Sequence, residues 1–136
     1  MGGDANYLQI GQVAERTGLS LKTIRHYDEV GLVQPSARST GGFRLYTATD
    51  VDRLLVIRRM KPLGFTLEEM KQLLETLGTL DDGAASGPQR DTAAADLRAF
   101  RNKARESAER LRKQLAYAHE FTELLSARVS PQESGG

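Results

Sequence analysis

Apolar residues recur at helical spacing in the run from Ile10 to Val33, IGQVAERTGLSLKTIRHYDEVGLV. The spacing predicts a first helix that begins near Ile10 and ends at Gly18, a residue that adopts positive φ without strain. Ser20 is a favourable N-cap residue and predicts a second helix that runs to about Val30. Two short helices joined by a tight turn are therefore expected here.

The second of these helices is amphipathic. Ile24 and Tyr27 lie three residues apart and share the side that would face a core. The opposite side carries hydrogen-bond donors and cations, namely Lys22, Thr23, Arg25 and His26. A short helix with this pattern, braced by a shorter one, is typical of the helix-turn-helix unit that enters a DNA major groove.

A β wing is expected next. Leu32-Val33 reads as an extended segment, residues 36–42 as a turn-rich loop, and Phe43 to Tyr46 as an alternating strand. A hairpin of this kind would carry Arg38 and Arg44 against a phosphate backbone. A short strand over 7–10 is also expected, and the residues from Met1 to Asn6 are expected to be disordered.

Two further helices follow, each with a capping-box signature at its start. Thr47 with Asp50 predicts a third helix that ends at Gly64, and Thr66 with Glu69 predicts a fourth from Leu67 to about residue 77. Residues 78–89 are rich in small and turn-forming types, which indicates an irregular linker.

The remainder of the chain predicts one long helix. Residues 90–127 contain neither Gly nor Pro, and their apolar positions recur about every 3.5 residues, the coiled-coil period. At about 1.5 Å per residue, such a helix would be roughly 55 Å long. No domain of this chain could cover so long a stripe, so a second copy of the helix is the simplest partner. Residues 128–136 are expected to be a disordered tail. The stripe comprises Leu97, Phe100, Ala104, Ala108, Leu111, Leu115, Ala118, Phe121 and Leu125.

Composition restricts the function classes. Of 136 residues, 39% are hydrophobic and 27% are charged, and no apolar run approaches the ~20 residues of a membrane span. The chain has no cysteine, which excludes disulfides, thiolate metal sites and thiol redox switching. The net charge of +1 is uninformative, but the local clusters of basic residues around the second and third helices favour DNA phosphates. Solvation of ordinary helix faces is the alternative interpretation.

Catalytic and metal sites find little support in the sequence. Neither histidine has an apparent nucleophile partner, and there is no glycine loop suited to phosphate. His119 and Glu123 share a helical face, but two ligands on one helix do not close a metal site. We therefore expect no enzyme activity, no metal site and no cofactor, and a cofactor-binding site cannot be assigned.

These motifs, together with the later run GGFRLYTATDVDRLLVIRRMKPLGFTLEEM, resemble the MerR (mercury-resistance regulator) family of bacterial transcription regulators. The resemblance is close over residues 7–77 and architectural over the rest. It implies a mainly α fold, with a winged helix-turn-helix DNA-binding domain and a small β wing, followed by a long antiparallel coiled-coil dimerisation helix. The domains would be the DNA-binding head at 7–77, a linker at 78–89, the dimerisation helix at 90–127 and the tail at 128–136.

The resemblance also implies which residues contact DNA. Arg25 could make a bidentate contact with guanine or clamp a phosphate, and Tyr27 could touch the DNA backbone or simply pack in the core. His26 stands where family members usually have an aromatic residue, so its contact is open. The full expected DNA-binding set is Ser20, Lys22, Thr23, Arg25, His26, Tyr27, Arg38, Phe43, Arg44, Tyr46, Arg58, Arg59 and Lys61.

By the same resemblance, the expected function is that of a sequence-specific regulator. A homodimer would bind a pseudo-palindromic promoter operator in double-stranded DNA and distort it, with RNA polymerase as a partner at the promoter and a cytoplasmic, nucleoid-associated location in a bacterium. A small-molecule effector is admissible, and so is a regulator with no ligand. Phe100, Tyr117 and Phe121 could line an effector site or only pack in the dimer seam. The alternatives are a coiled-coil adaptor and a non-specific architectural DNA-binding protein.

Overall fold

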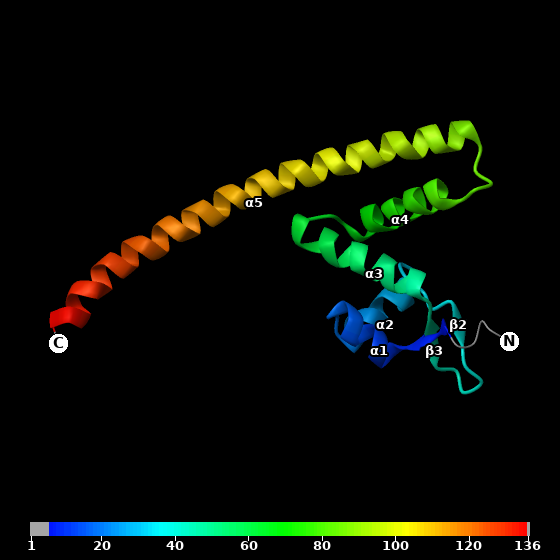
Figure 1. Cartoon of the computed structure of the whole chain (residues 1–136), viewed down its shortest axis with the longest axis horizontal. Coiled ribbons are helices and arrows are strands. Elements are labelled where there is room, and N and C mark those ends of the chain that lie inside the picture. The colour runs from blue at the N-terminus through cyan, green and yellow to red at the C-terminus, as the bar shows by residue number, and fades with distance from the viewer. Residues whose placement is uncertain (1–5, 136) are drawn as a thin grey trace. The chain divides into compact units, whose positions relative to one another are not determined.

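The two helices expected at the start of the chain are present. Gly18 ends the first in a left-handed conformation at φ 72°, and the Ser20 side chain caps the second by accepting from the backbone of Thr23. The computed structural model describes residues 6–135 and forms two compact units that meet between Leu97 and Arg98 (Figure 1). In chain order, the elements are β1 (Leu8–Gln9), α1 (Ile10–Thr17), α2 (Leu21–Glu29), β2 (Ala37–Arg38), β3 (Arg44–Tyr46), α3 (Ala48–Met60), the 3-10 turn η2 (Lys61–Leu63), α4 (Leu67–Asp81) and α5 (Gly87–Gly135).

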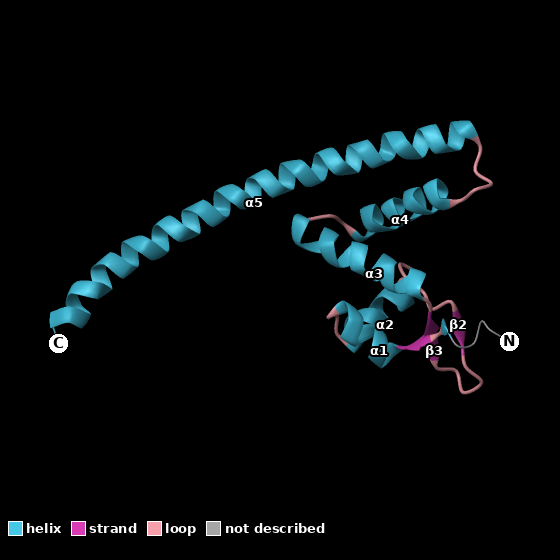
Figure 2. Cartoon of the chain, in the orientation of Figure 1, coloured by secondary structure: helices cyan, strands magenta, loops and turns pink. Residues whose placement is uncertain are grey.

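The three strands form one small antiparallel sheet in the order β1-β3-β2, as Figure 2 shows in magenta. Leu8 pairs with Tyr46, and Arg38 pairs with Arg44. The first wing strand was predicted too early in the chain: β2 lies at 37–38, inside the expected loop. The apolar segment before it is instead bonded to the end of α2, where the Leu32 and Val33 amides both donate to the Tyr27 carbonyl. The pairing of β1 with the wing was not expected either, and Ile10 belongs to α1 rather than to the strand.

The core of the first unit lies among α1, α2, α3 and the sheet. Val13, Ile24, Leu54 and Ile57 are completely buried, and so is Tyr46 from β3. α1 contacts α2, α3 and β3, which makes it the element around which the head is packed. Ile24 and Tyr27, which the sequence places on the inner side of α2, are both part of this core, as expected.

Both predicted capping boxes are present. At the start of α3, the Asp50 backbone donates to Thr47 Oγ1 at 3.2 Å, and the Thr47 backbone donates to Asp50 Oδ2 at 3.0 Å. Thr66 and Glu69 repeat this exchange at 2.9 and 3.1 Å at the start of α4. Between the two helices, Gly64 has φ 85°, a value that glycine adopts without strain. The reversal from α3 to α4 is thus built as the sequence predicted.

The predicted linker is mostly helical. α4 continues through Gly78 to Asp81, and α5 begins at Gly87, so the irregular connection covers only residues 82–86. A helical glycine costs about 1 kcal/mol relative to alanine, which is too little to end a helix packed on α3. The start of α5 is a capping box that the sequence reading overlooked: Gln89 N donates to Ser86 Oγ at 3.2 Å, and Ser86 N donates to Gln89 Oε1 at 2.8 Å.

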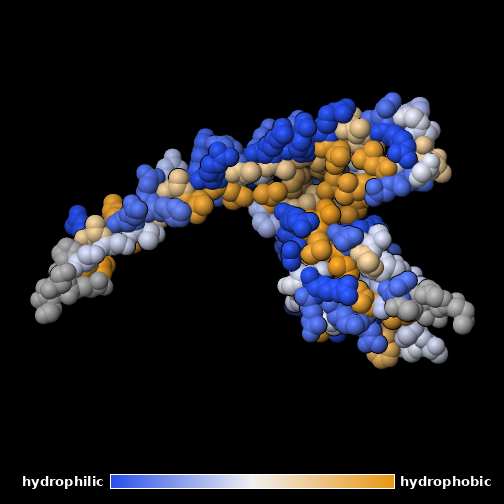
Figure 3. Space-filling model, in the orientation of Figure 1, coloured by the Kyte–Doolittle hydropathy of each residue, from blue (hydrophilic) through white to orange (hydrophobic). Residues whose placement is uncertain are grey.

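The second unit is the continuation of α5. The expected tail from residue 128 is instead helical as far as Gly135, and Ser130 Oγ donates to the Ser126 carbonyl at 2.9 Å. Of the residues from Met1 to Asn6 that were expected to be disordered, 1–5 fall outside the described part of the chain, as does Gly136, whereas Asn6 is described and lies in a 3-10 turn. In this single copy, Leu115, Phe121 and Leu125 are 56%, 61% and 46% exposed. Figure 3 shows hydrophobic residues in orange along one side of the helix and hydrophilic residues in blue along the other.

The Thr47 cap generates a prediction about stability. Replacing Thr47 with Ala removes the oxygen that accepts from Asp50 N, so the free energy of unfolding should fall by about 1 kcal/mol. Thr49→Ala is the control, because Thr49 is exposed within the first turn of the same helix, and it should change stability by less than about 0.5 kcal/mol. Urea denaturation measures both variants. Equal losses in the two would show that the cap contributes nothing particular.

Candidate nucleic-acid interface

The outer face of α2 is polar, cationic and accessible. Lys22, Arg25 and His26 are exposed, whereas Ile24 and Tyr27 on the inner side are buried. Neither Lys22 nor Arg25 is held by a hydrogen bond or ion pair within residues 6–135. A guanidinium carries five N–H donors in a planar fork that matches a guanine edge or a phosphate. The helix therefore presents uncommitted donors to a ligand.

The first turn of α2 is fixed by Ser20. Its Oγ accepts from Thr23 N at 3.0 Å and donates to Thr23 Oγ1 at 2.9 Å. Ser20 is exposed and Thr23 is half-buried. Both hydroxyls can accept or donate one further hydrogen bond, but their first role is to cap the helix. His26 lies beside Tyr27, with ring centroids 6.1 Å apart and planes inclined at 44°.

A buried carboxylate joins α2 to the wing. Asp28 Oδ2 accepts from Arg44 Nε at 2.6 Å and from an Arg38 terminal nitrogen at 3.0 Å. The Asp28 side chain is only 7% exposed, while those of Arg44 and Arg38 are 24% and 49% exposed. The hydrogen bond to Asp28 raises the pKa of Arg44 above its ordinary value. Arg44 keeps both terminal nitrogens free of other bonds among the described residues, so one guanidinium can hold Asp28 and still bind an anion.

Asp28 was missed by the sequence reasoning. A usable signal existed, because Asp28 lies four residues after the core residue Ile24 and therefore on the buried side of α2. An acid at such a position requires a cationic or hydrogen-bonding partner. The two wing arginines, which were assigned only to phosphate, are that partner.

Tyr46 does not lie on the surface. Its side chain is completely buried, and its hydroxyl has no hydrogen-bond partner among the described residues. The expected phosphate contact of Tyr46 is therefore corrected. Arg44 and Tyr46 lie on the same face of β3, because side chains two residues apart in a strand point the same way. Arg44 stands at the first residue of the strand and is 24% exposed, whereas Tyr46 at its other end is completely buried. Tyr27 is 5% exposed, which agrees with the core alternative for that ring.

Phe43 occupies the turn of the wing. It is 70% exposed, and its backbone is held by Ser39, which donates to the Phe43 carbonyl at 2.9 Å and accepts from the Phe43 amide at 3.1 Å. The turn needs Gly42 at φ 84°, and a side chain at Gly41 would come within 3.1 Å of the Phe43 ring. The wing thus ends in a constrained turn that carries one accessible aromatic ring.

The basic end of α3 divides into two kinds of residue. The Arg58 guanidinium donates to the Thr17 carbonyl at the end of α1, so it ties the two helices together. Arg59 and Lys61 are exposed and have no such bond among the described residues. Arg58 is exposed as well and retains donors for an anion. Arg59 and Lys61 are the freer candidates for phosphate.

Two comparisons with known sequences bear on this geometry. Residues 8–77 match the model of the MerR HTH family regulatory proteins, and residues 51–118 match the model described as MerR, DNA binding. The chain belongs to the MerR family. It is a DNA-binding transcription regulator of that family, which is a family of regulators and not of enzymes.

Individual relatives agree with this assignment. The chain is 42% identical over 102 residues to the transcriptional regulator HmrR of Rhizobium leguminosarum bv. viciae. This match covers 75% of this chain and 77% of that protein. It is 44% identical over 92 residues to CueR of Vibrio cholerae, a match that covers 68% of this chain but only 60% of that relative.

Solved structures show the same fold. A MerR family regulator from Bacillus thuringiensis aligns with a TM-score of 0.68 at 21% identity over 88% of this chain and 97% of that chain. HiNmlR, described as a MerR family regulator lacking the sensor domain and bound to promoter DNA, aligns with a TM-score of 0.60 at 25% identity, covering 91% of this chain and 88% of that one.

Over residues 6–135, no group of three or more His, Asp or Glu side chains is placed to hold a metal ion. Within the same range, no helix has the length and apolar character needed to span a membrane.

The corrected position of Tyr46 generates the second prediction. Tyr46→Phe removes a buried hydroxyl that has no partner, so the free energy of unfolding should stay the same or rise by about 1 kcal/mol. Burial raises the pKa of this hydroxyl above 10.0, so the folded form holds the proton more tightly than the unfolded chain. The wild-type protein should therefore lose stability above pH 10, and Tyr46→Phe should lose less.

Chemical denaturation at neutral and alkaline pH measures this difference. Tyr117→Phe is the control, because Tyr117 is 70% exposed, and it should behave as wild type. DNA affinity of Tyr46→Phe should remain within about twofold of wild type. A clear loss of DNA affinity in a Tyr46→Phe variant of unchanged stability would show that the Tyr46 hydroxyl does contribute to DNA binding.

Proposed function

We propose that the chain acts as a homodimer that binds a pseudo-palindromic promoter operator and distorts the duplex. One recognition helix, α2, would enter a major groove in each half-site, and the wing would lie on the flanking backbone. The observation that carries the proposal is the exposed, uncommitted Lys22 and Arg25 on α2, beside a wing that Asp28 ties to the same helix.

The roles of the basic residues differ by their surroundings. Arg25 is free to form a bidentate contact with a base edge, which discriminates among sequences. Arg44 is held by Asp28, so its remaining nitrogens are pre-positioned for phosphate and contribute to every sequence alike. Lys22, His26, Arg59 and Lys61 add further contacts to this surface.

Dimerisation is supported by the exposure of α5. From residue 108 to residue 130, every side chain of the helix is exposed in the single copy. The exposed apolar residues include Leu111, Leu115, Phe121 and Leu125, which recur at the spacing of a helical seam. Long helices in water depend on packing of an apolar face. A second copy of the same helix would provide that packing.

The same proposal extends to transcription. A dimer of fixed half-site separation would bend or untwist promoter DNA for RNA polymerase, at a deformation cost of several kcal/mol that contacts along the duplex offset. Support comes from the relative HiNmlR, which is described as lacking the sensor domain and bound to promoter DNA. Such a regulator would work in the bacterial cytoplasm, at the nucleoid.

A footprint on the DNA upstream of the gene tests the proposal against its alternatives. A discrete two-fold footprint with bending supports the regulator. Diffuse protection would indicate an architectural protein, and no protection would indicate an adaptor that binds other proteins.

The base-reading role of Arg25 generates the third prediction. Arg25→Ala should weaken operator binding by about 1–3 kcal/mol and blur base preference, whereas Arg44→Ala should weaken all sequences alike. Arg112→Ala is the control, because this arginine on α5 is 75% exposed and pairs with Glu109 across one helical turn of the same helix. Fluorescence anisotropy with operator and scrambled duplexes measures each affinity. Unchanged operator binding by Arg25→Ala would contradict the assignment.

The seam along α5 generates the fourth prediction. Leu115→Glu introduces a charge into the apolar stripe and should shift the protein from dimer to monomer, because a buried unpaired carboxylate is strongly unfavourable. Lys113→Glu changes an exposed position outside the stripe and should leave the dimer intact. Sedimentation equilibrium at micromolar concentration distinguishes the two. A wild-type protein that is monomeric under these conditions would overturn the homodimer.

A further inference from the structure

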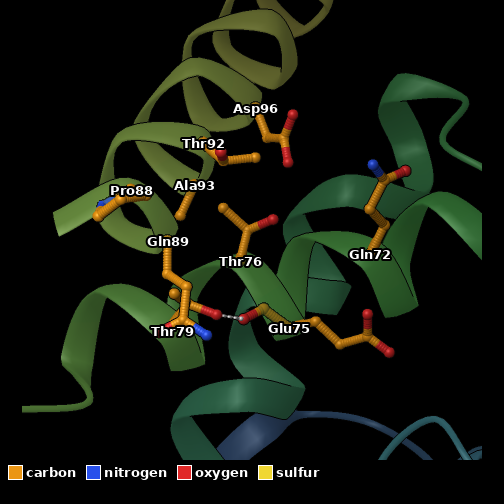
Figure 4. Close-up of a pocket in the computed structure, with 9 residues that line it drawn as sticks. All are labelled: Gln72, Glu75, Thr76, Thr79, Pro88, Gln89, Thr92, Ala93 and Asp96. Carbon is orange, nitrogen blue, oxygen red and sulfur yellow. Dashed lines mark hydrogen bonds between the residues drawn. The ribbon is translucent and has the colours of Figure 1, made fainter. Parts of the chain in front are cut away.

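A cavity of about 500 Å³ lies between α4 and the first turns of α5, within the first unit. Its volume falls in the range of sites that bind small molecules. Figure 4 shows its walls: Gln72, Thr76 and Thr79 come from α4, and Gln89, Thr92 and Asp96 come from α5. The spacings of three and four residues place each set on one face of its helix.

Thr76 is the unusual residue in this cavity. It is only 6% exposed, and within residues 6–135 no hydrogen bond is made by its hydroxyl. Thr79 on the same helix shows the ordinary arrangement, in which Oγ1 donates to the carbonyl four residues earlier, Glu75, at 3.1 Å. The Thr76 side chain lies between the two helices, facing the α5 wall (Figure 4). The Thr76 hydroxyl oxygen is not one of the fully enclosed polar atoms, so it is reachable from the cavity, and a bound ligand could provide the hydrogen bond that the described residues do not.

The charge of the walls is one-sided. Glu75 and Asp96 are the ionisable residues that line the cavity, and no basic side chain lines it. Neither carboxylate forms a salt bridge within the described residues. Arg90 directly follows Gln89 in α5, but its guanidinium donates to the carbonyl of Leu80 near the end of α4 and to that of Asp82 in the connection before α5. The cavity thus offers negative charge together with hydroxyl and amide groups.

We propose that this cavity is a binding site for a small organic cation of the amine or guanidine type. Such a ligand would pair its charge with Asp96, assisted by Glu75 at the rim, and would donate an N–H to Thr76 Oγ1. A hard metal ion fits less well, because such ions take six or more oxygen ligands, and two carboxylates on separate helices do not form such a cluster here.

The site has a regulatory use only if the proposed function holds. The cavity spans the junction between α4 of the DNA-binding head and the start of α5, so an occupied site would hold these two helices together. A ligand that binds one arrangement of the junction better than another would shift the population of DNA-binding states.

The binding proposal is tested on the full chain without DNA, so that its failure is separable from failure of the proposed function. Isothermal titration calorimetry uses agmatine, spermidine and tetramethylammonium as probes, with mannitol as the uncharged comparison. We expect agmatine or spermidine, which carry N–H groups, to bind saturably. Mannitol should not bind. Tetramethylammonium should bind more weakly, because it cannot donate to Thr76.

Variants assign the site. Asp96→Asn and Thr76→Val preserve side-chain shape, and each should weaken cation binding by about tenfold or more. Asp91→Asn is the matched control: it removes the same charge from an exposed position of α5 that does not line the cavity, and it should bind as wild type. Circular dichroism confirms that each variant is folded.

Three results would overturn the proposal. In the first, no cation binds saturably up to about 10 mM. In the second, mannitol binds as tightly as the cations. In the third, Asp96→Asn and Asp91→Asn weaken cation binding by the same factor. The last result would indicate general attraction to an acidic surface. Operator affinity measured with and without the bound cation then tests the regulatory use, and an operator that is not bound at all would refute the proposed function while leaving the ligand site standing.

Discussion

The interaction of Asp28 with Arg38 and Arg44 is the constraint on which the reading surface depends. α2 and the wing are separate in sequence, and beyond the core residues that each contributes they are joined by this charged cluster. One nearly buried carboxylate at the end of α2 accepts from a guanidinium on each wing strand. Its charge is neutralised at close range, as burial requires. The arrangement sets the orientation of the wing relative to the recognition helix before any nucleic acid is present, so less conformational entropy is lost on binding.

Much of the head could be predicted from sequence because local chemistry determines it. Gly18, Ser20, Thr47 and Thr66 mark helix ends by mechanisms that act within four residues, and each is found in the expected role. The inner faces of α1, α2 and α3 follow from helical periodicity. The accessible cations of α2 follow from the same periodicity, since a residue opposite the core must face outward.

The errors arose where distant residues decide the outcome. The burial of Tyr46 depends on which face of β3 meets α1 and α3, and a strand of three residues gives too short an alternation to determine it. Arg58 donates to a carbonyl 41 positions earlier in the chain, a contact that no local pattern encodes. The helical continuation through Gly78 reflects packing of α4, which outweighs the intrinsic preference of one residue. The capping box of Ser86 and Gln89, by contrast, is a local sequence signal that could have predicted the start of α5. It lies within a run of small and turn-forming residues, which favoured the interpretation as a linker.

The way in which the basic residues are held also affects the ionic character of the surface. Asp28 neutralises one of the two positive charges that Arg38 and Arg44 bring to the wing. Arg58 uses one of its N–H donors in a hydrogen bond to the Thr17 carbonyl. A count of lysines and arginines therefore overstates how many condensed counterions a phosphate backbone would release on contact. A surface with fewer but better-oriented charges binds DNA of unrelated sequence less strongly. The ratio of specific to non-specific affinity is therefore higher.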